Sequence, residues 1–157
     1  MSSAIVIPPT SPTRYLSGMA ALNLPSPKGT GDWHMTQTFF RPRAHRSRSF
    51  IAGEGCATNT TPILADIGVF DCTDLLDSLH IPYEEGSAYA ATHARAIADL
   101  VLSAVMRGES PEFVRLDDYM PRNSDKQEVF DLLAIALKQL EPQQQEQVLE
   151  WQIKNAV

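Results

Sequence analysis

Several features that carry chemistry in other proteins are scarce or missing in this sequence of 157 residues. The two cysteines, Cys56 and Cys72, are sixteen positions apart, which matches neither a redox CxxC pair nor a zinc site. No apolar run approaches the roughly 18 residues that a membrane helix needs. No GxGxxG pattern occurs, and Lys28 precedes the glycines of KGTG, whereas the lysine of a phosphate loop follows them. The first residues also lack the basic and apolar regions of a signal peptide. We therefore expect a cytoplasmic protein that makes no use of a membrane, a disulfide framework or a phosphate loop.

Basic residues are scarce too, and they are unevenly distributed. The net charge is −6. Residues 1–55 carry six basic and two acidic groups, whereas the remainder carries seven basic and seventeen acidic groups. General nucleic-acid binding usually shows a strongly basic face. DNA binding is therefore not the expected function, although the first third of the chain can form a local basic patch.

The hydrophobic pattern predicts a single α+β domain over residues 14–157. Residues 1–13 are rich in proline, serine and threonine and are predicted to form a flexible tail, although AIVI can also pair as an edge strand. The domain is expected to contain a small antiparallel sheet from the N-terminal half, about five packed helices and a C-terminal helical hairpin. The expected helices are 14–23, 72–79, 92–107, 124–140 and 142–157, and the expected strands are 33–40, 49–53 and 87–91.

The segment GTGDWH brings an acid, an indole and an imidazole together. In a strand, residues two apart share a face, so Asp32 could orient His34 as a general base. The structural alternative makes Gly31-Asp32 a turn and Trp33 a core anchor. No nucleophile elbow accompanies the three residues. The structural interpretation is the favoured one, and no catalytic residue is assigned.

The four histidines are scattered, with no HxxxH or HExxH spacing, so neither a metal site nor a cofactor is expected. His93 falls in the first turn of a predicted helix, where the helix dipole disfavours a charged imidazole. We expect a neutral, structural histidine there. Arg95 and Asp99, four residues apart on the same helix, are expected to form a surface ion pair worth only about half a kcal/mol.

One basic cluster stands out in RPRAHRSR. Its arginines can contact phosphates or an acidic protein. Alternatively, they form a solvated loop that protects an edge strand from aggregation. The cluster consists of Arg41, Arg43, Arg46 and Arg48.

Four segments, RYLSGMAALNLP, GTGDWH, LADIGVFDCTDLL and THARAIADLVL, resemble small bacterial proteins encoded beside toxin genes, the antitoxin-like members of toxin–antitoxin pairs. The resemblance spans roughly residues 14–120. It implies a cytoplasmic protein that neutralises a partner by covering the partner's working surface. No catalytic or ligand motif defines this group, so the resemblance assigns no active residue. An acidic antitoxin facing a basic toxin would also fit the charge balance, because complementary fields speed association.

The sequence thus favours a non-enzymatic, protein-binding function, namely an antitoxin that neutralises a cognate toxin by direct contact. The expected partner-binding residues are the four arginines of the basic cluster together with Trp33 and His34. A homodimer is left open. Two alternatives also remain open: a small hydrolase that uses Asp32 and His34, and a nucleic-acid binder that uses residues 41–48.

Overall fold

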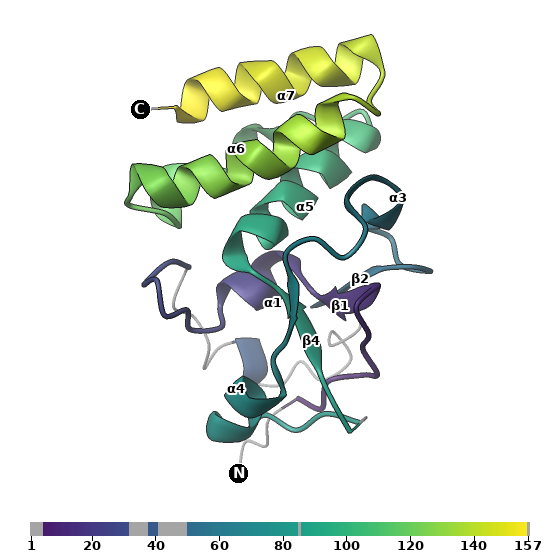
Figure 1. Cartoon of the computed structure of the whole chain (residues 1–157), viewed down its shortest axis with the longest axis vertical. Helices are drawn as coiled ribbons and strands as arrows, with labels where there is room; N and C mark the ends of the chain where they lie inside the picture. Colours follow the sequence, from purple (N-terminus) through teal and green to yellow (C-terminus); the bar gives the residue numbers. More distant parts are fainter. Residues whose placement is uncertain (1–4, 32–37, 41–49, 85, 157) are drawn as a thin grey trace.

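The computed structural model describes residues 5–31, 38–40, 50–84 and 86–156, and it confirms the α+β class (Figure 1). A small four-stranded sheet has the order β2-β1-β4-β3. The strands are β1 (Arg14–Leu16), β2 (Ile51–Gly53), β3 (Val69–Asp71) and β4 (Tyr89–Ala91). The helices are α1 (Gly18–Leu22), α3 (Thr61–Leu64), α4 (Thr73–Ser78), α5 (His93–Met106), α6 (Asn123–Leu137) and α7 (Pro142–Asn155).

The sheet is mixed, which corrects the expectation of a purely antiparallel one. Strand β1 pairs antiparallel with β2, and β3 pairs antiparallel with β4, but the central pair of β1 and β4 is parallel, with Leu16 opposite Ala90. No tight turn joins these two strands, since most of the intervening chain passes through other elements. Their relative direction is therefore set by tertiary packing. Strand β4 also lies beyond the midpoint of the chain, so the N-terminal half does not supply the whole sheet.

The two faces of the sheet contribute to two different apolar clusters. Tyr15, Ala52 and Ala91 pack with the helices α5, α6 and α7. Their strand neighbours Leu16, Ile51 and Ala90 belong to the second cluster, with side chains from the N-terminal segment and α4. This division follows from the alternation of side chains along a strand. Figure 1 accordingly shows α5, α6 and α7 together at one end of the molecule and α4 at the other.

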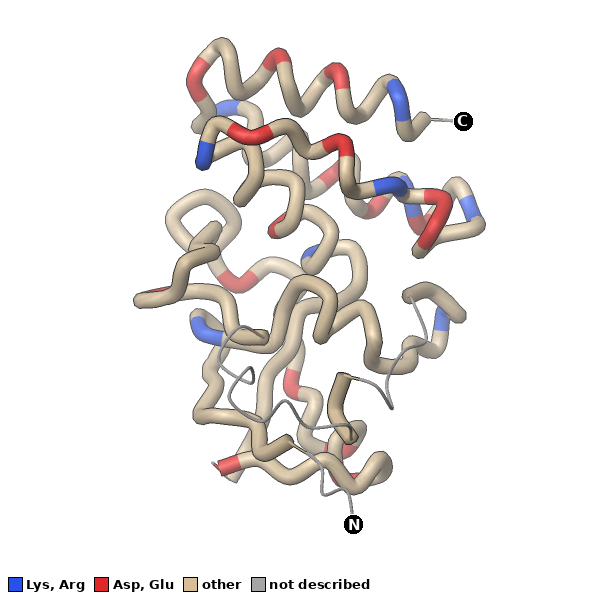
Figure 2. Tube along the Cα trace, turned by 180° about the vertical axis from the view of Figure 1, so that it is seen from behind, with Lys and Arg blue, Asp and Glu red and all other residues tan. Residues whose placement is uncertain are grey.

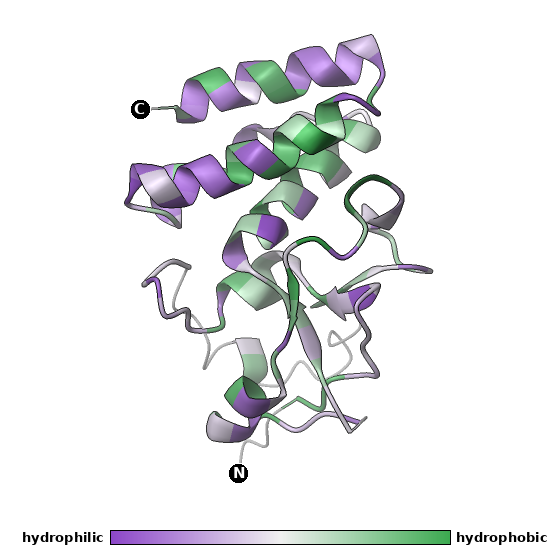
Figure 3. Ribbon diagram, viewed as in Figure 1, coloured by the Kyte–Doolittle hydropathy of each residue, from purple (hydrophilic) through white to green (hydrophobic). Residues whose placement is uncertain are grey.

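Helix α5 is the central helix of the fold. Its residues are buried from His93 to Asp99 and again from Val101 to Val105. Helices α1, α6 and α7 and strand β4 all pack against it. Four alanines in this helix allow such close approach on several sides, and Figure 3 shows its largely apolar colouring. Only a small part of this helix therefore faces solvent.

The N-terminal segment packs on the domain from residue 5 onward. The side chain of Ile7 is fully buried, its backbone N–H donates to the carbonyl of Pro82 at 2.8 Å, and its carbonyl accepts from Glu84 N–H at 2.9 Å. Ile5 is buried as well. This part of residues 1–13 is therefore not a separate tail, since its isoleucines find apolar partners that the proline-rich composition did not reveal.

Two local predictions need correction. The segment 14–23 is strand β1 followed by the short helix α1, which begins at Gly18 with a φ of +59°. Most of the expected strand 33–40 lies outside the described residues, and its described end is helical at residues 38–39. Phe39 there is a core residue in edge-to-face contact with Phe50, with ring centroids 5.8 Å apart.

The C-terminal helical hairpin is confirmed by α6 and α7. The buried Trp151 of α7 donates its indole N–H to the carbonyl of Val114 at 2.8 Å and contacts Phe130 of α6 edge-on. Helix α6 begins at Asn123, one residue before the expected start, and its N-cap side chain makes no capping hydrogen bond. A capping box is present instead at α7, between Glu141 and Gln144.

Candidate functional site

The partner-binding residues predicted from the sequence lie outside the part of the chain that the structure describes. This applies to Trp33 and His34, and to Asp32, which belonged to the hydrolase alternative. It applies equally to the whole basic cluster of Arg41, Arg43, Arg46 and Arg48. These assignments remain predictions.

Gly31, which precedes Asp32, has a structural role. Gly31 has a φ of +108°, a region that favours glycine, and its N–H donates to the carbonyl of Tyr119 at 2.9 Å. A Cβ atom at Gly31 would lie 2.5 Å from the carbonyl oxygen of Leu22 and 2.6 Å from Cε1 of His93. Gly31 is therefore packed tightly against the start of α5.

His93 joins this segment to α5. Its Nε2 lies 2.9 Å from the carbonyl oxygen of Leu24, which can only accept, so Nε2 carries the proton. Its Nδ1 then accepts from the hydroxyl of Thr30 at 2.6 Å. Burial lowers the pKa of His93 below its ordinary value of 6.5, because the charged form is poorly solvated. The expected neutral, structural histidine is confirmed.

Arg95 and Asp99 form a buried ion pair, which corrects the expected surface pair. Their side chains are 0% and 1% exposed, and the distance from Arg95 Nε to Asp99 Oδ1 is 3.0 Å. They are buried because α5 is enclosed by other elements. The sequence did contain a signal of this burial, because Arg95 and Asp99 are the only Asp, Glu, Lys or Arg residues in the mainly apolar helix from His93 to Met106.

The remaining hydrogen bonds of Arg95 and Asp99 join them to side-chain hydroxyls and backbone carbonyls of other elements. Asp99 accepts from the hydroxyls of Tyr15 at 2.8 Å, Ser17 at 2.7 Å and Thr60. Arg95 donates to the hydroxyls of Tyr15 and Thr60, both at 2.9 Å, and to the carbonyls of residues 65 and 67. Burial and the neighbouring Asp99 raise the pKa of Tyr15, so its hydroxyl stays protonated. The network links β1, α5 and the α3 region and serves the fold.

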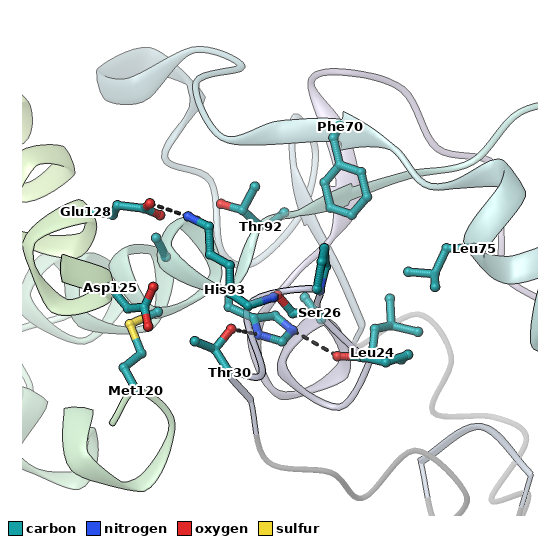
Figure 4. Close-up of a pocket in the computed structure, with 16 residues that line it drawn as sticks. Leu24, Ser26, Thr30, Phe70, Leu75, Thr92, His93, Met120, Asp125 and Glu128 are labelled. Atoms are coloured by element: carbon teal, nitrogen blue, oxygen red, sulfur yellow. Dashed lines mark hydrogen bonds and ion pairs between the residues drawn. The ribbon is translucent and has the colours of Figure 1, made fainter. Parts of the chain in front are cut away.

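A pocket of about 440 Å³ opens beside this framework (Figure 4). It lies between the segment 24–30, strand β3, the start of α5 and the N-terminal part of α6. Most of its lining is apolar. The apolar side chains are Ala21, Leu24, Pro25, Pro27, Phe70, Leu75, Ala91, Ala94 and Met120.

The ionisable residues of the pocket come from distant parts of the sequence. Lys28 pairs with Glu128, one hundred residues further along the chain. Asp125 is nearly buried and accepts from Arg122 Nε at 2.8 Å, while Arg122 also donates to the carbonyl of Lys28. No sequence spacing indicates such a pocket, because only the fold brings Lys28 to α6.

A second surface feature lies on the side of α7 that faces away from the core. Leu149 and Ile153, one helical turn apart, are 48% and 77% exposed. Phe113, in the short 3-10 helix that packs against α7, is 60% exposed. Residues 109–156, which include this region, carry ten acidic and five basic groups. Figure 2 shows acidic residues along α6 and α7.

Two kinds of feature are absent from the described ranges. No group of three or more His, Cys, Asp and Glu side chains there is placed to hold a metal ion. None of the helices in those ranges combines the length and the apolar character required to cross a bilayer.

Comparison of the chain with protein-family models, with curated proteins and with solved structures finds no match.

Proposed function

We propose that the protein is a non-enzymatic, protein-binding protein, an antitoxin that acts in the cytoplasm by covering the working surface of a basic cognate toxin. The observation that carries the proposal is the exposure of Leu149 and Ile153 on α7 and of Phe113 on the 3-10 helix packed against it, within the acidic C-terminal region. We call these three residues the α7 surface.

The α7 surface has the composition of a contact region. Isolated exposed apolar side chains are common, but an exposed Phe, Leu and Ile on two elements that pack together place apolar area where a partner can cover it. Val148 and Trp151 hold the opposite side of α7 in the core, so the helix presents this surface on a fixed support.

Charge supports a basic partner. Residues 109–156 have a net charge of −5, from ten acidic and five basic groups. Acidic groups around an apolar contact attract a basic protein and repel nucleic acid. The resemblance of residues 14–120 to antitoxin-like proteins leads to the same class of partner.

The basic cluster is proposed as a second contact, made with an acidic patch on the otherwise basic toxin. Changing Arg43, Arg46 and Arg48 together to Ser should weaken complex formation, and the weakening should diminish as the salt concentration rises, because exposed charges are screened. Unchanged affinity at low salt would remove these arginines from the interface.

The decisive experiment uses the product of the neighbouring gene. We expect that product to be toxic when it is expressed alone and harmless when this protein is co-expressed. A neighbouring product that is harmless alone, or that stays toxic during co-expression, would contradict the antitoxin proposal.

A double variant tests the surface itself. Leu149→Asp with Ile153→Asp should leave the fold intact, since both side chains are exposed, but should abolish both neutralisation and complex formation. The matched control is Ile67→Asp, an isoleucine of 44% exposure in the turn before β3. Loss of neutralisation in both variants, or in neither, would exclude the α7 surface as the contact.

A further inference from the structure

The pocket beside α5 is not used by the proposed protein contact, and its volume and lining are typical of a small-molecule site. We propose that it binds an uncharged, mainly apolar molecule the size of a two-ring compound, with one oxygen that accepts a hydrogen bond. Three features of the pocket support this class of ligand, namely its volume, its fixed apolar walls and the pairing of its charges.

The volume of the pocket sets the size of the ligand. An apolar cavity of about 150 Å³ is large enough for benzene, and small-molecule sites usually enclose about 300 to 1,000 Å³. At about 440 Å³, this pocket has room for a molecule larger than a single ring. Phe70 of β3, which is 39% exposed, and Leu75 of α4 both line it (Figure 4). An apolar ligand that covers these two side chains removes their exposed area from water, which favours binding.

The walls are held in place by contacts that do not depend on a ligand. His93 bonds to both ends of the segment 24–30, through the carbonyl of Leu24 and the hydroxyl of Thr30. The same segment is tied to α6, because Lys28 pairs with Glu128. A pocket with fixed walls loses little conformational entropy when it binds, which favours affinity.

Every ionisable side chain of the lining is paired or neutral. Lys28 pairs with Glu128, and Asp125 pairs with Arg122, which lies just outside the lining. His93 is uncharged, because burial lowers its pKa below the ordinary value. The charges of the two ion pairs cancel, so a charged ligand would lose its hydration without gaining a free partner, or would have to break one of the pairs. The pocket therefore favours an uncharged ligand.

The uncharged polar side chains of the lining leave room for one kind of hydrogen bond. The hydroxyl of Thr30 donates to His93 at 2.6 Å. Ser26 and Thr92 each accept from a backbone N–H at 3.2 Å through the hydroxyl oxygen, and a hydroxyl that accepts in this way can still donate its proton to a ligand. A hydroxyl or carbonyl oxygen on the ligand can accept this hydrogen bond without carrying a charge.

Three probes of similar shape test the preference for an uncharged ligand. Calorimetric titration of the full chain with naphthylmethanol, naphthylmethylamine and naphthoate varies the charge of the polar group. We expect the alcohol to bind most tightly and each charged probe to bind about tenfold more weakly. Absence of alcohol binding would overturn the proposed site. A charged probe that binds as tightly as the alcohol would overturn the preference for an uncharged ligand.

Two matched pairs of variants locate the binding and leave the ion pairs of the pocket intact. Phe70→Ala and Leu75→Ala should each weaken alcohol binding about tenfold, because each removes apolar contact area. Phe113→Ala and Leu149→Ala shorten the same two residue types outside the lining and should leave alcohol binding unchanged. All four side chains are partly or fully exposed, so the variants should fold, as circular dichroism will verify. Full alcohol binding in Phe70→Ala and Leu75→Ala would place the binding elsewhere and reject the proposal.

These titrations use the purified chain and no toxin. Failure of the alcohol to bind would therefore leave the antitoxin proposal unaffected, and failure of neutralisation would leave the pocket proposal unaffected.

Discussion

Replacing Asp99 by Asn tests whether the buried ion pair in α5 maintains the fold. The substitution preserves the shape of the side chain and removes its charge. The hydroxyls of Tyr15 and Ser17 donate to one carboxylate oxygen, at 2.8 and 2.7 Å, and Arg95 donates to the other. An amide nitrogen cannot accept a hydrogen bond, so one pair of donors loses its acceptor. Arg95, with its side chain fully buried, also loses its counter-charge.

Removing one partner of a buried pair costs about 3 to 5 kcal/mol, because an uncompensated charge stays in the interior. This is a large part of the roughly 5 to 15 kcal/mol by which a domain is stable. With a urea m-value of about 2 kcal/mol/M, a loss of about 4 kcal/mol lowers the unfolding midpoint by about 2 M.

Urea unfolding followed by circular dichroism measures this shift. The control is Asp131→Asn on α6, whose exposed carboxylate accepts only from Gln127 at 2.9 Å among the contacts described here. That change should stay within about 0.5 kcal/mol. If the Asp99→Asn midpoint coincides with that of the control, the interpretation of a buried, stabilising pair is wrong.

A milder change and a double variant keep the test informative if Asp99→Asn does not fold. Tyr15→Phe removes one donor to Asp99 and one acceptor for Arg95, and should cost about 1.5 to 3 kcal/mol. Arg95→Met combined with Asp99→Leu should cost less than the two single changes together, because neither charge is left alone. Additive losses would contradict direct coupling of the pair.

Three further predictions concern single residues. Burial lowers the pKa of His93, so below about pH 6.5 the unfolded chain takes up a proton that the folded chain does not. The contribution of His93 to the free energy of unfolding should therefore be complete above about pH 6.5 and should fall as the pH drops below it. Urea unfolding at several pH values should show a flatter dependence for His93→Gln. Gly31→Ala should lower the melting temperature, since its Cβ would lie 2.5 Å from a backbone oxygen at a φ of +108°, and an unchanged value would contradict that packing. Burial raises the pKa of Cys72 to about 12, so a thiol reagent should label only Cys56 in the folded protein and both thiols in urea; labelling of both at equal rates without urea would show that Cys72 is not protected.

The proposed contacts rest on different parts of the chain, and each has its own test. The α7 surface lies entirely in described residues and can be altered without disturbing the core. The basic cluster at 41–48 and the GDWH residues rest on sequence alone. A neutralisation assay with variants of each separates a contact formed by α7 from one formed by the arginines.

The sequence by itself determined the features that depend on local pattern. Apolar spacing predicted the helices α5, α6 and α7, and the hairpin of the last two, because helical periodicity is encoded within a few turns. The first-turn position of His93 predicted its neutral state. The segments SFIAG and SAYAA were expected as strands, and they contain β2 and β4.

Only the tertiary structure decided which local features meet. The parallel pairing of β1 and β4 depends on the path of the intervening chain, and the burial of Arg95 and Asp99 depends on the elements that enclose α5. The pocket exists because Lys28 and Glu128, one hundred residues apart, lie together. Short-range pattern carries no information on such contacts, since the free energy that forms them comes from packing between distant segments.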